Sequence, residues 1–294
     1  MPSWRRRRPL PVALVAAALA CATSLQRQAE TAAAKALISP EQAKQVGLQV
    51  QQELQKQGVR FVSDATVTGW VAKVSDPLFK VARQARPDIQ DWRVHIIDDP
   101  KTVNAFATTG GDLYVYSGLI QLADNGAELG GVLAHEIGHV ALYHVQRQMV
   151  DAVGLQALTA LALGKNPGVA TQLVAGAGGQ VAMLANSRGD EAEADAWGVV
   201  HANEAGYDPH GLVRFFQKLE TQEGKTSQSL AWLSDHPTTP SRVEDTQRLI
   251  REKNLHATGR GPGGLDRVKA ALAKLPPPPR TQGGAGSATA SPAS

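Results

Sequence analysis

The hydrophobic pattern that follows residue 38 is helical at first. A Ser-Pro-Glu run at 39–41 predicts a helix start, because serine caps a first turn and proline suits the first helical position. Apolar residues then keep helical spacing to about residue 57. A second helix is expected to begin at 63–64, and Pro77 is expected to kink or end it, because proline removes an internal hydrogen bond.

The pattern then changes to short extended segments. Residues 92–97 alternate between polar and apolar like a half-buried strand and stop at an Asp-Asp-Pro turn. A second extended piece covers 104–107, and the glycine pair at 110–111 turns the chain into a third piece over 113–116. A sheet of about three short strands cannot supply the core alone, so we predict a mostly helical α+β fold.

The rest of the chain is again helical. Helical sequence runs from Gly118 to about residue 148, with a break near 125–126. Residues 152–184 are rich in Ala, Leu, Val and Gly, but a Gly-Lys-Asn-Pro-Gly run at 164–168 divides them into two pieces. Each piece is too short to cross the roughly 30 Å hydrocarbon core of a bilayer. Further helices are expected over 190–204, 209–220, 241–253 and about 265–275.

Composition limits the class of protein. The chain has 294 residues, of which 43% are hydrophobic and 19% are charged, which excludes a wholly disordered, collagen-like or multi-spanning membrane protein. The net charge of +3 comes from Arg5–Arg8, since the remaining chain carries 26 basic and 27 acidic residues. A nucleic-acid partner is therefore not expected. The single cysteine excludes an intrachain disulfide.

The first twenty residues have the pattern of an export signal. The arginine run precedes a short apolar run, which ends in Ala-Leu-Ala directly before Cys21. The predicted organisation is listed from the N-terminus: a signal peptide over 1–20, a polar spacer over 21–37, the main domain over 38–255, a C-terminal helix over 256–275, and a disordered Pro/Gly/Ala/Ser tail over 276–294.

Cys21 has two interpretations. It resembles the lipidated cysteine of bacterial lipoproteins, although Ala18 stands where Leu or Val is usual. Cleavage by an ordinary signal peptidase would instead leave a free thiol at the new N-terminus. Acyl chains on Cys21 would hold the protein on a membrane surface, since each buried CH₂ contributes about 0.8 kcal/mol. Ala22 in place of Asp implies, by the same resemblance, the periplasmic side of the outer membrane.

The candidate chemistry lies on two predicted helices. His135 and His139 are four apart and project from one helix face, where both rings can reach one metal ion, while Glu136 lies beside them as a general base. A helix with two surface histidines is the alternative. A catalytic tetrahedral site needs a third protein ligand, and Glu191 and Asp195 share one face of a later helix. Alone, those acids would indicate a solvated helix start; the histidine pair favours a ligand.

Four blocks together resemble the HtpX/Oma family of gluzincin metalloendopeptidases, to which the CAAX prenyl proteases also belong. The blocks are Asn104-Ala105-Phe106-Ala107 with Gly110-Gly111 and Gly118-Leu119; His135 to His139; Ser187-Arg188 with Glu191-Ala192-Glu193-Ala194-Asp195; and His236-Pro237 with Arg242. They occur in the family's order over roughly residues 40–253. Thr109 departs from the pattern, where a proline commonly precedes the glycine pair, and the membrane-spanning helices of several relatives are absent.

The resemblance implies a zincin-like fold with one Zn²⁺ per chain. It assigns His135, His139 and Glu191 as the zinc ligands and Glu136 as the general base that later acts as an acid. Asp195 matches an aspartate that is expected to orient a ligating histidine.

Two residues near the end of the domain have paired interpretations. His236 matches a histidine that, in exported relatives, approaches the metal as a gate; the alternative is a loop histidine that caps the following helix. Arg242 is expected to stabilise the oxyanion or to bind substrate carbonyls; the alternative is a surface salt bridge. The remaining histidines receive no functional role, although His201 is close enough in sequence to Asp195 to approach the site: His95, His144, His201, His210 and His256.

The expected function follows from the site and one strand. The extended segment 104–107 is expected to form a sheet edge beside the cleft, where it can pair with the main chain of an extended substrate. The sequence therefore predicts a zinc endopeptidase that acts on unfolded or misassembled envelope proteins in the bacterial periplasm. The alternatives are an exported chaperone or assembly factor whose metal site is blocked, and a zinc amidase that acts on cell-wall peptides.

Overall fold

The computed structural model describes residue 35 and residues 38–166, 168–174, 187–223, 228–237 and 240–277. The predicted signal peptide, Cys21 and the tail from residue 278 lie outside these residues. Within the described part of the chain, each helix is too short or too polar to cross a bilayer.

The sheet has three strands, as the alternating pattern predicts: β1 (Arg93–Ile97), β2 (Ala105–Ala107) and β3 (Asp112–Tyr116). The strand order is β1-β3-β2, with β1 parallel and β2 antiparallel to the central strand β3. The short strand β2 is therefore an edge strand, which is the position predicted for residues 104–107.

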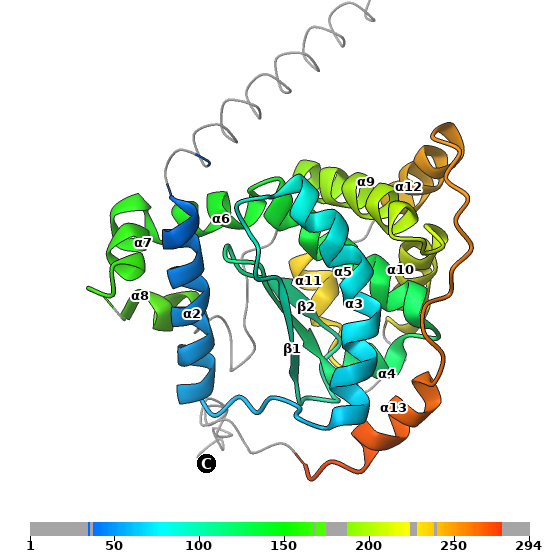
Figure 1. The fold of residues 1–294 in the computed structure, drawn as a ribbon, viewed down its shortest axis with the longest axis horizontal. Helices are drawn as coiled ribbons and strands as arrows, with labels where there is room; N and C mark the ends of the chain where they lie inside the picture. Colours follow the sequence, from blue (N-terminus) through cyan, green and yellow to red (C-terminus); the bar gives the residue numbers. More distant parts are fainter. Residues whose placement is uncertain are drawn as a thin grey trace, which may run out of the picture.

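Helices cover both faces of this sheet (Figure 1). On one face, α2 (Pro40–Lys56) packs Val50 and Leu54 against Phe106 and Tyr114. On the other face lie α3 (Ala65–Ala85) and α5 (Gly126–Ala141), whose apolar side chains join the alternate side chains of the strands in the main core. The mostly helical α+β fold is confirmed.

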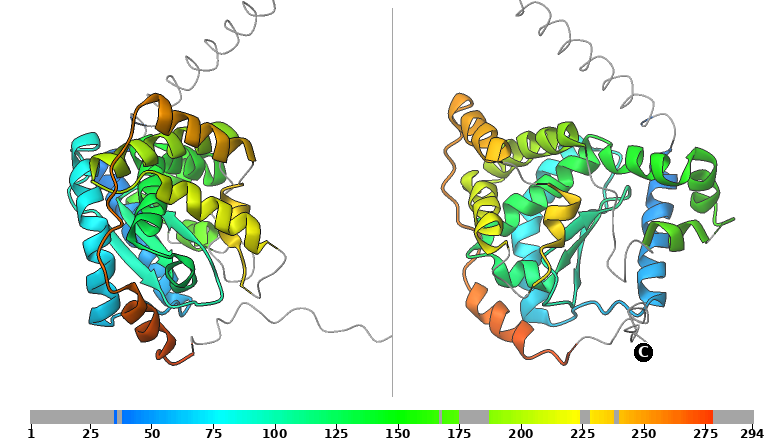
Figure 2. Two further views of the ribbon diagram at one scale, coloured as in Figure 1. Left: turned by 90° about the vertical axis from the view of Figure 1, so that its right-hand side faces the viewer. Right: turned by 180° about the vertical axis from the view of Figure 1, so that it is seen from behind.

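The remaining helices surround α5 or extend the domain (Figure 2). The longest of them, α9 (Arg188–Glu204), lies along α5, and α10 (His210–Gln222) packs against α5 from another side. The arm formed by α6, α7 and α8 contacts α2. The bounds of the other helices are α4 (Ser117–Leu122), α6 (His144–Val153), α7 (Leu155–Ala162), α8 (Gly168–Val174), α11 (Ala231–Asp235), α12 (Pro240–Glu252) and α13 (Leu265–Ala273).

Pro77 does not end its helix, which was one of its two predicted effects, because α3 continues through it to Ala85. Proline at this position leaves the carbonyl of Lys73 without its usual helical donor. The hydroxyl of Tyr207 lies 3.4 Å from that carbonyl oxygen and donates at 2.9 Å to the next one, that of Val74. A residue 130 positions away in sequence therefore contacts the carbonyl that the proline leaves free.

The helix predicted to reach residue 148 is also interrupted. Tyr143 adopts the left-handed conformation, with φ of 64°, so that α5 ends at Ala141 and α6 begins at His144. The break at 164–168 between α7 and α8 agrees with the prediction, and residues 175–184 of the second apolar piece lie outside the described residues. The short helix α11 lies between the segments predicted as helices over 209–220 and 241–253 and was not itself predicted.

Candidate metal centre

The helix α5 is capped by a residue next to it in sequence and is buried along almost its whole length. The side chain of Asn125 caps it by accepting hydrogen bonds from the backbone of Ala127 and Glu128. All residues from Gly126 to Val140 are buried, so the paired histidines are not surface histidines and that alternative is wrong.

Two glycines let α9 approach α5 closely. A Cβ atom added to Gly198 of α9 would lie 3.1 Å from the backbone nitrogen of His135, and one added to Gly138 of α5 would lie 3.2 Å from the carbonyl oxygen of Ala194. These separations are shorter than ordinary van der Waals contacts. The close crossing brings the acidic face of α9 against the histidine face of α5.

Three predicted ligands converge at this crossing. The Nε2 atoms of His135 and His139 are 3.0 Å apart, and the two carboxylate oxygens of Glu191 lie 3.5 Å and 3.3 Å from them, respectively. Ligands bound tetrahedrally at about 2.0–2.1 Å are separated from one another by about 3.3 Å. The spacing and the two-nitrogen, one-oxygen donor set therefore fit a zinc-type ion.

The charges of the cluster also favour a cation. Burial alone would lower the pKa of His135, but hydrogen bonds to Asp195 and Glu191 raise it to about 9. Burial lowers the pKa of His139 well below its usual value, which keeps a ring nitrogen free to bind a metal. Despite its burial, Glu191 has a pKa below its usual value because His236, His135 and His139 surround it. The site thus stabilises positive charge.

His236 completes the cluster from the loop that follows α11. Its Nδ1 lies 3.2 Å from Nε2 of His135 and 3.0 Å from an oxygen of Glu191, and its ring stacks on Trp232. All four groups offer ligand atoms within 4.8 Å of one another. The structure therefore brings His236 to the metal-binding group, as the gate hypothesis requires.

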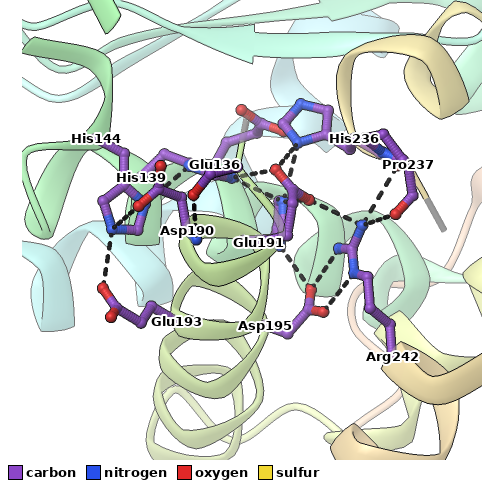
Figure 3. A network of polar contacts seen from close by, with 12 residues as sticks. Glu136, His139, His144, Asp190, Glu191, Glu193, Asp195, His236, Pro237 and Arg242 are labelled. Atoms are coloured by element: carbon purple, nitrogen blue, oxygen red, sulfur yellow. Dashed lines mark hydrogen bonds and ion pairs between the residues drawn. The ribbon is translucent and has the colours of Figure 1, made fainter. Parts of the chain in front are cut away.

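Glu136 lies beside the cluster and is almost fully buried. One of its carboxylate oxygens is 3.4 Å from Nε2 of His236 (Figure 3). Burial raises the pKa of its carboxyl group, which suits a residue that takes up a proton and later releases it.

Asp195 and Arg242 support the ligands from behind. One oxygen of Asp195 lies 2.9 Å from Nδ1 of His135, which is the predicted orienting contact. Arg242 donates two hydrogen bonds of 2.8 Å to the same carboxylate, and its third nitrogen lies 2.8 Å from Glu191 (Figure 3). Arg242 therefore forms a salt bridge, as its alternative interpretation held, but this pair is buried and not at the surface, because Arg242 is only 7% exposed. Its predicted contact with the oxyanion or with substrate carbonyls stays a prediction.

A sequence model of peptidase family M48 matches residues 65–250, more than half of the chain. The chain belongs to peptidase family M48. The predicted resemblance to the HtpX/Oma type is thereby confirmed, and the convergent histidines and glutamate are compatible with the metal site of a metallopeptidase domain.

Individual relatives of this M48 domain are distant. A beta-barrel assembly-enhancing protease of Yersinia pestis is 28% identical over 207 residues, which cover 67% of this chain and 42% of the relative. The metalloprotease YcaL of Escherichia coli (strain K12) is 32% identical over 187 residues, or 61% of this chain and 71% of the relative. The mitochondrial metalloendopeptidase OMA1 of Schizosaccharomyces pombe is 28% identical over 166 residues, or 56% and 48%. The chain spans less than half the length of the Yersinia and Schizosaccharomyces proteins.

The predicted substrate residues of the M48 domain lie on or beside the edge strand. The side chains of Ala105 and Ala107 belong to the core that includes α5, whereas Phe106 points to the other face and stacks on Tyr114. Any contact of Phe106 with a substrate at the metal centre would therefore involve its main chain. Asn104 accepts a hydrogen bond from the backbone of Ala105 and donates one of 2.8 Å to Asp235, directly before His236.

The chain itself pairs with the residues that precede β2. The backbone nitrogen of Val103 donates to Ser229 at 2.8 Å, and its carbonyl oxygen accepts from Trp232 at 3.0 Å. The segment that carries His236 thus lies along the extension of the predicted substrate edge.

Sequence reasoning missed the support of His139. His144, to which no role was assigned, places its Nδ1 3.0 Å from Nδ1 of His139 and its Nε2 3.2 Å from Glu193. The interval of five between the histidines does not place them on one face of a continuous helix. The contact arises only because the left-handed residue Tyr143 turns the chain. His201 stacks on Trp197 and is not part of the cluster, so its approach to the site is not observed.

Proposed function

We propose that this M48 domain is a zinc-dependent endopeptidase that hydrolyses unfolded or misassembled proteins of the bacterial envelope. The observation that carries the proposal is the convergence of His135, His139 and Glu191 within 3.0–3.5 Å of one another, beside the buried carboxyl group of Glu136. Two histidines and one carboxylate are a donor set of catalytic zinc sites.

Different residues of the chain have different roles in peptide hydrolysis. A zinc ion held by His135, His139 and Glu191 would polarise a peptide carbonyl and lower the pKa of water to about 7. Glu136 accepts a proton from the attacking water and then delivers it to the leaving amine. Asp195 holds the ring of His135, and Arg242 holds Asp195 and Glu191 in turn.

His236 must leave its observed position before a substrate carbonyl reaches the cluster. Its ring nitrogen lies within 3.2 Å of two ligand groups, which favours a resting form with restricted access. The same observation supports the second candidate function, an exported chaperone or assembly factor whose metal site stays closed.

The edge strand supports a broad substrate class. An extended substrate that pairs with β2 is recognised mainly by its backbone, so that many unfolded sequences can bind. This edge and the family match favour an endopeptidase over a cell-wall amidase. The relatives named beta-barrel assembly-enhancing proteases support a role in the envelope. We extend the proposal to a periplasmic location, with acyl groups on Cys21 as an anchor to the outer membrane.

The test is cleavage of casein by the purified protein, with bound zinc quantified, beside the variants Glu136→Gln and His236→Ala. We expect one zinc per chain in all three proteins, no cleavage by Glu136→Gln, and faster cleavage by His236→Ala than by the wild type. Zinc without cleavage in both the wild type and His236→Ala would favour the chaperone. A wild type without zinc, or an active Glu136→Gln, would contradict the proposal.

A further inference from the structure

His144 is a fully buried histidine that the hydrolytic mechanism does not use. Its Nδ1 lies 3.0 Å from Nδ1 of His139, and its Nε2 lies 3.2 Å from a carboxylate oxygen of Glu193 and 3.8 Å from one of Asp190 (Figure 3). A chain of polar contacts therefore runs from the metal-binding group through two imidazole rings to α9.

Only one placement of protons suits all members of this chain. His139 directs Nε2 to the ligand cluster, so its neutral ring carries its proton on Nδ1. That N–H donates to Nδ1 of His144, which leaves the proton of His144 on Nε2. The Nε2–H group in turn donates to the carboxylate of Glu193. In each ring, one nitrogen then donates a proton and the other offers a lone pair.

The same proton placement argues against a second metal site here. His144, Asp190 and Glu193 have the composition of a cation site, but Nε2 of His144 carries a proton and cannot bind an ion. Asp190 is also paired with the guanidinium group of Arg147. The cluster is better explained as support for His139.

The turn that places His144 here requires an unfavourable backbone conformation at the residue before it. The preceding residue, Tyr143, has φ of 64°, which is unfavourable for a residue other than glycine. The guanidinium group of Arg86 lies 4.1 Å from the centre of the Tyr143 ring and donates a hydrogen bond of 2.6 Å to the carbonyl of Val140. This buried arginine secures the turn that carries His144 back to His139.

We propose that His144 is a positioning residue that sets the tautomer and ring orientation of His139, with Glu193 as its own partner. The inference rests on the proposed function to the extent that His139 binds a metal ion. Partners of this kind are valuable because they hold a ligand ready before the ion arrives.

Zinc affinity, measured by competition with a chromophoric chelator, tests the proposal in the full chain. We expect His144→Leu to weaken zinc binding about 10–100-fold and to change the visible spectrum of the cobalt-substituted protein. His144→Asn should bind zinc nearly as the wild type does, because its amide oxygen can replace Nδ1 as the acceptor. Glu193→Gln should have a smaller effect, since that side chain is 39% exposed. His201→Leu is the matched control and should not change zinc affinity.

Equal zinc affinity of His144→Leu and the wild type would overturn the inference, and so would equal weakening by Leu and Asn, which would indicate packing alone. If His144→Leu does not fold, the ring nitrogens of the zinc-bound wild type can be observed by NMR. Protons on Nδ1 of His139 and Nε2 of His144 are expected, and the reverse arrangement would overturn the inference. A wild type that binds no zinc would reject the proposed function and this inference together, whereas an active wild type with an unaffected His144→Leu would reject the inference alone.

Discussion

The two ligand histidines of α5 have the same role but different support. Both are buried, and both direct Nε2 to one cluster. The other nitrogen of His135 meets the carboxylate of Asp195 directly, and Arg242 holds that carboxylate with two hydrogen bonds. The other nitrogen of His139 meets the ring of His144 and reaches a carboxylate only through it.

The difference follows from where α9 lies. Glu191 and Asp195 are four apart on α9, so that this helix supplies one ligand and one direct partner to the paired histidines. At His139 the facing position is already occupied by the ligand Glu191. A residue from the turn after α5 supplies the second partner there. One histidine thus depends on a buried ion pair, and the other depends on the backbone turn at Tyr143.

Removal of either ligand ring should have the largest effect on bound zinc. The effect should be the same for His135 and His139, although the two rings have different partners. His135→Ala and His139→Ala each delete one of three ligands, so we expect bound zinc to fall from one ion per chain to nearly none. Metal analysis after dialysis measures this, with the exposed His210→Ala as the control. If His139→Ala alone retained zinc, His236 would be acting as a replacement ligand.

Asp195→Asn tests how much the ion pair between Asp195 and Arg242 contributes to zinc affinity and to stability. We expect zinc affinity to fall about 10–100-fold and the unfolding free energy of the zinc-free protein to fall by about 3 kcal/mol, because Arg242 keeps a buried charge with one carboxylate partner fewer. Chemical denaturation measures the second quantity. The double variant Asp195→Asn/Arg242→Met should recover stability without recovering zinc affinity; recovery of both would show that Asp195 acts only through the fold.

Gly198→Ala and Gly138→Ala should have the smallest effects, because they test the helix crossing that both histidines share. Each new methyl group would meet backbone at 3.1–3.2 Å, so we expect a loss of about 1–3 kcal/mol of unfolding free energy. The control Gly69→Ala, inside α3 with open space at its Cβ position, should instead gain up to about 1 kcal/mol from helix propensity. Unchanged stability of both crossing variants would contradict the close approach.

Local sequence signals predicted much of the fold. The cap at Ser39, the alternation over 92–97 and the glycine-proline run at 164–168 correspond to a helix start, a strand and a helix break in the structure. Pro77 misled the prediction because the hydroxyl that contacts the freed carbonyl of Lys73 belongs to the distant Tyr207. Sequence patterns report the preference of a segment, whereas such a contact depends on a distant partner.

The sequence by itself determined which residues are candidate metal ligands. The spacing of four between His135 and His139, and between Glu191 and Asp195, places each pair on one helix face by local geometry alone. Only the tertiary structure decided that His236 approaches the ligands, that Arg242 is buried and that His144 supports His139. These contacts join side chains from separate elements, so they depend on how closely α9 crosses α5 and on the left-handed turn at Tyr143.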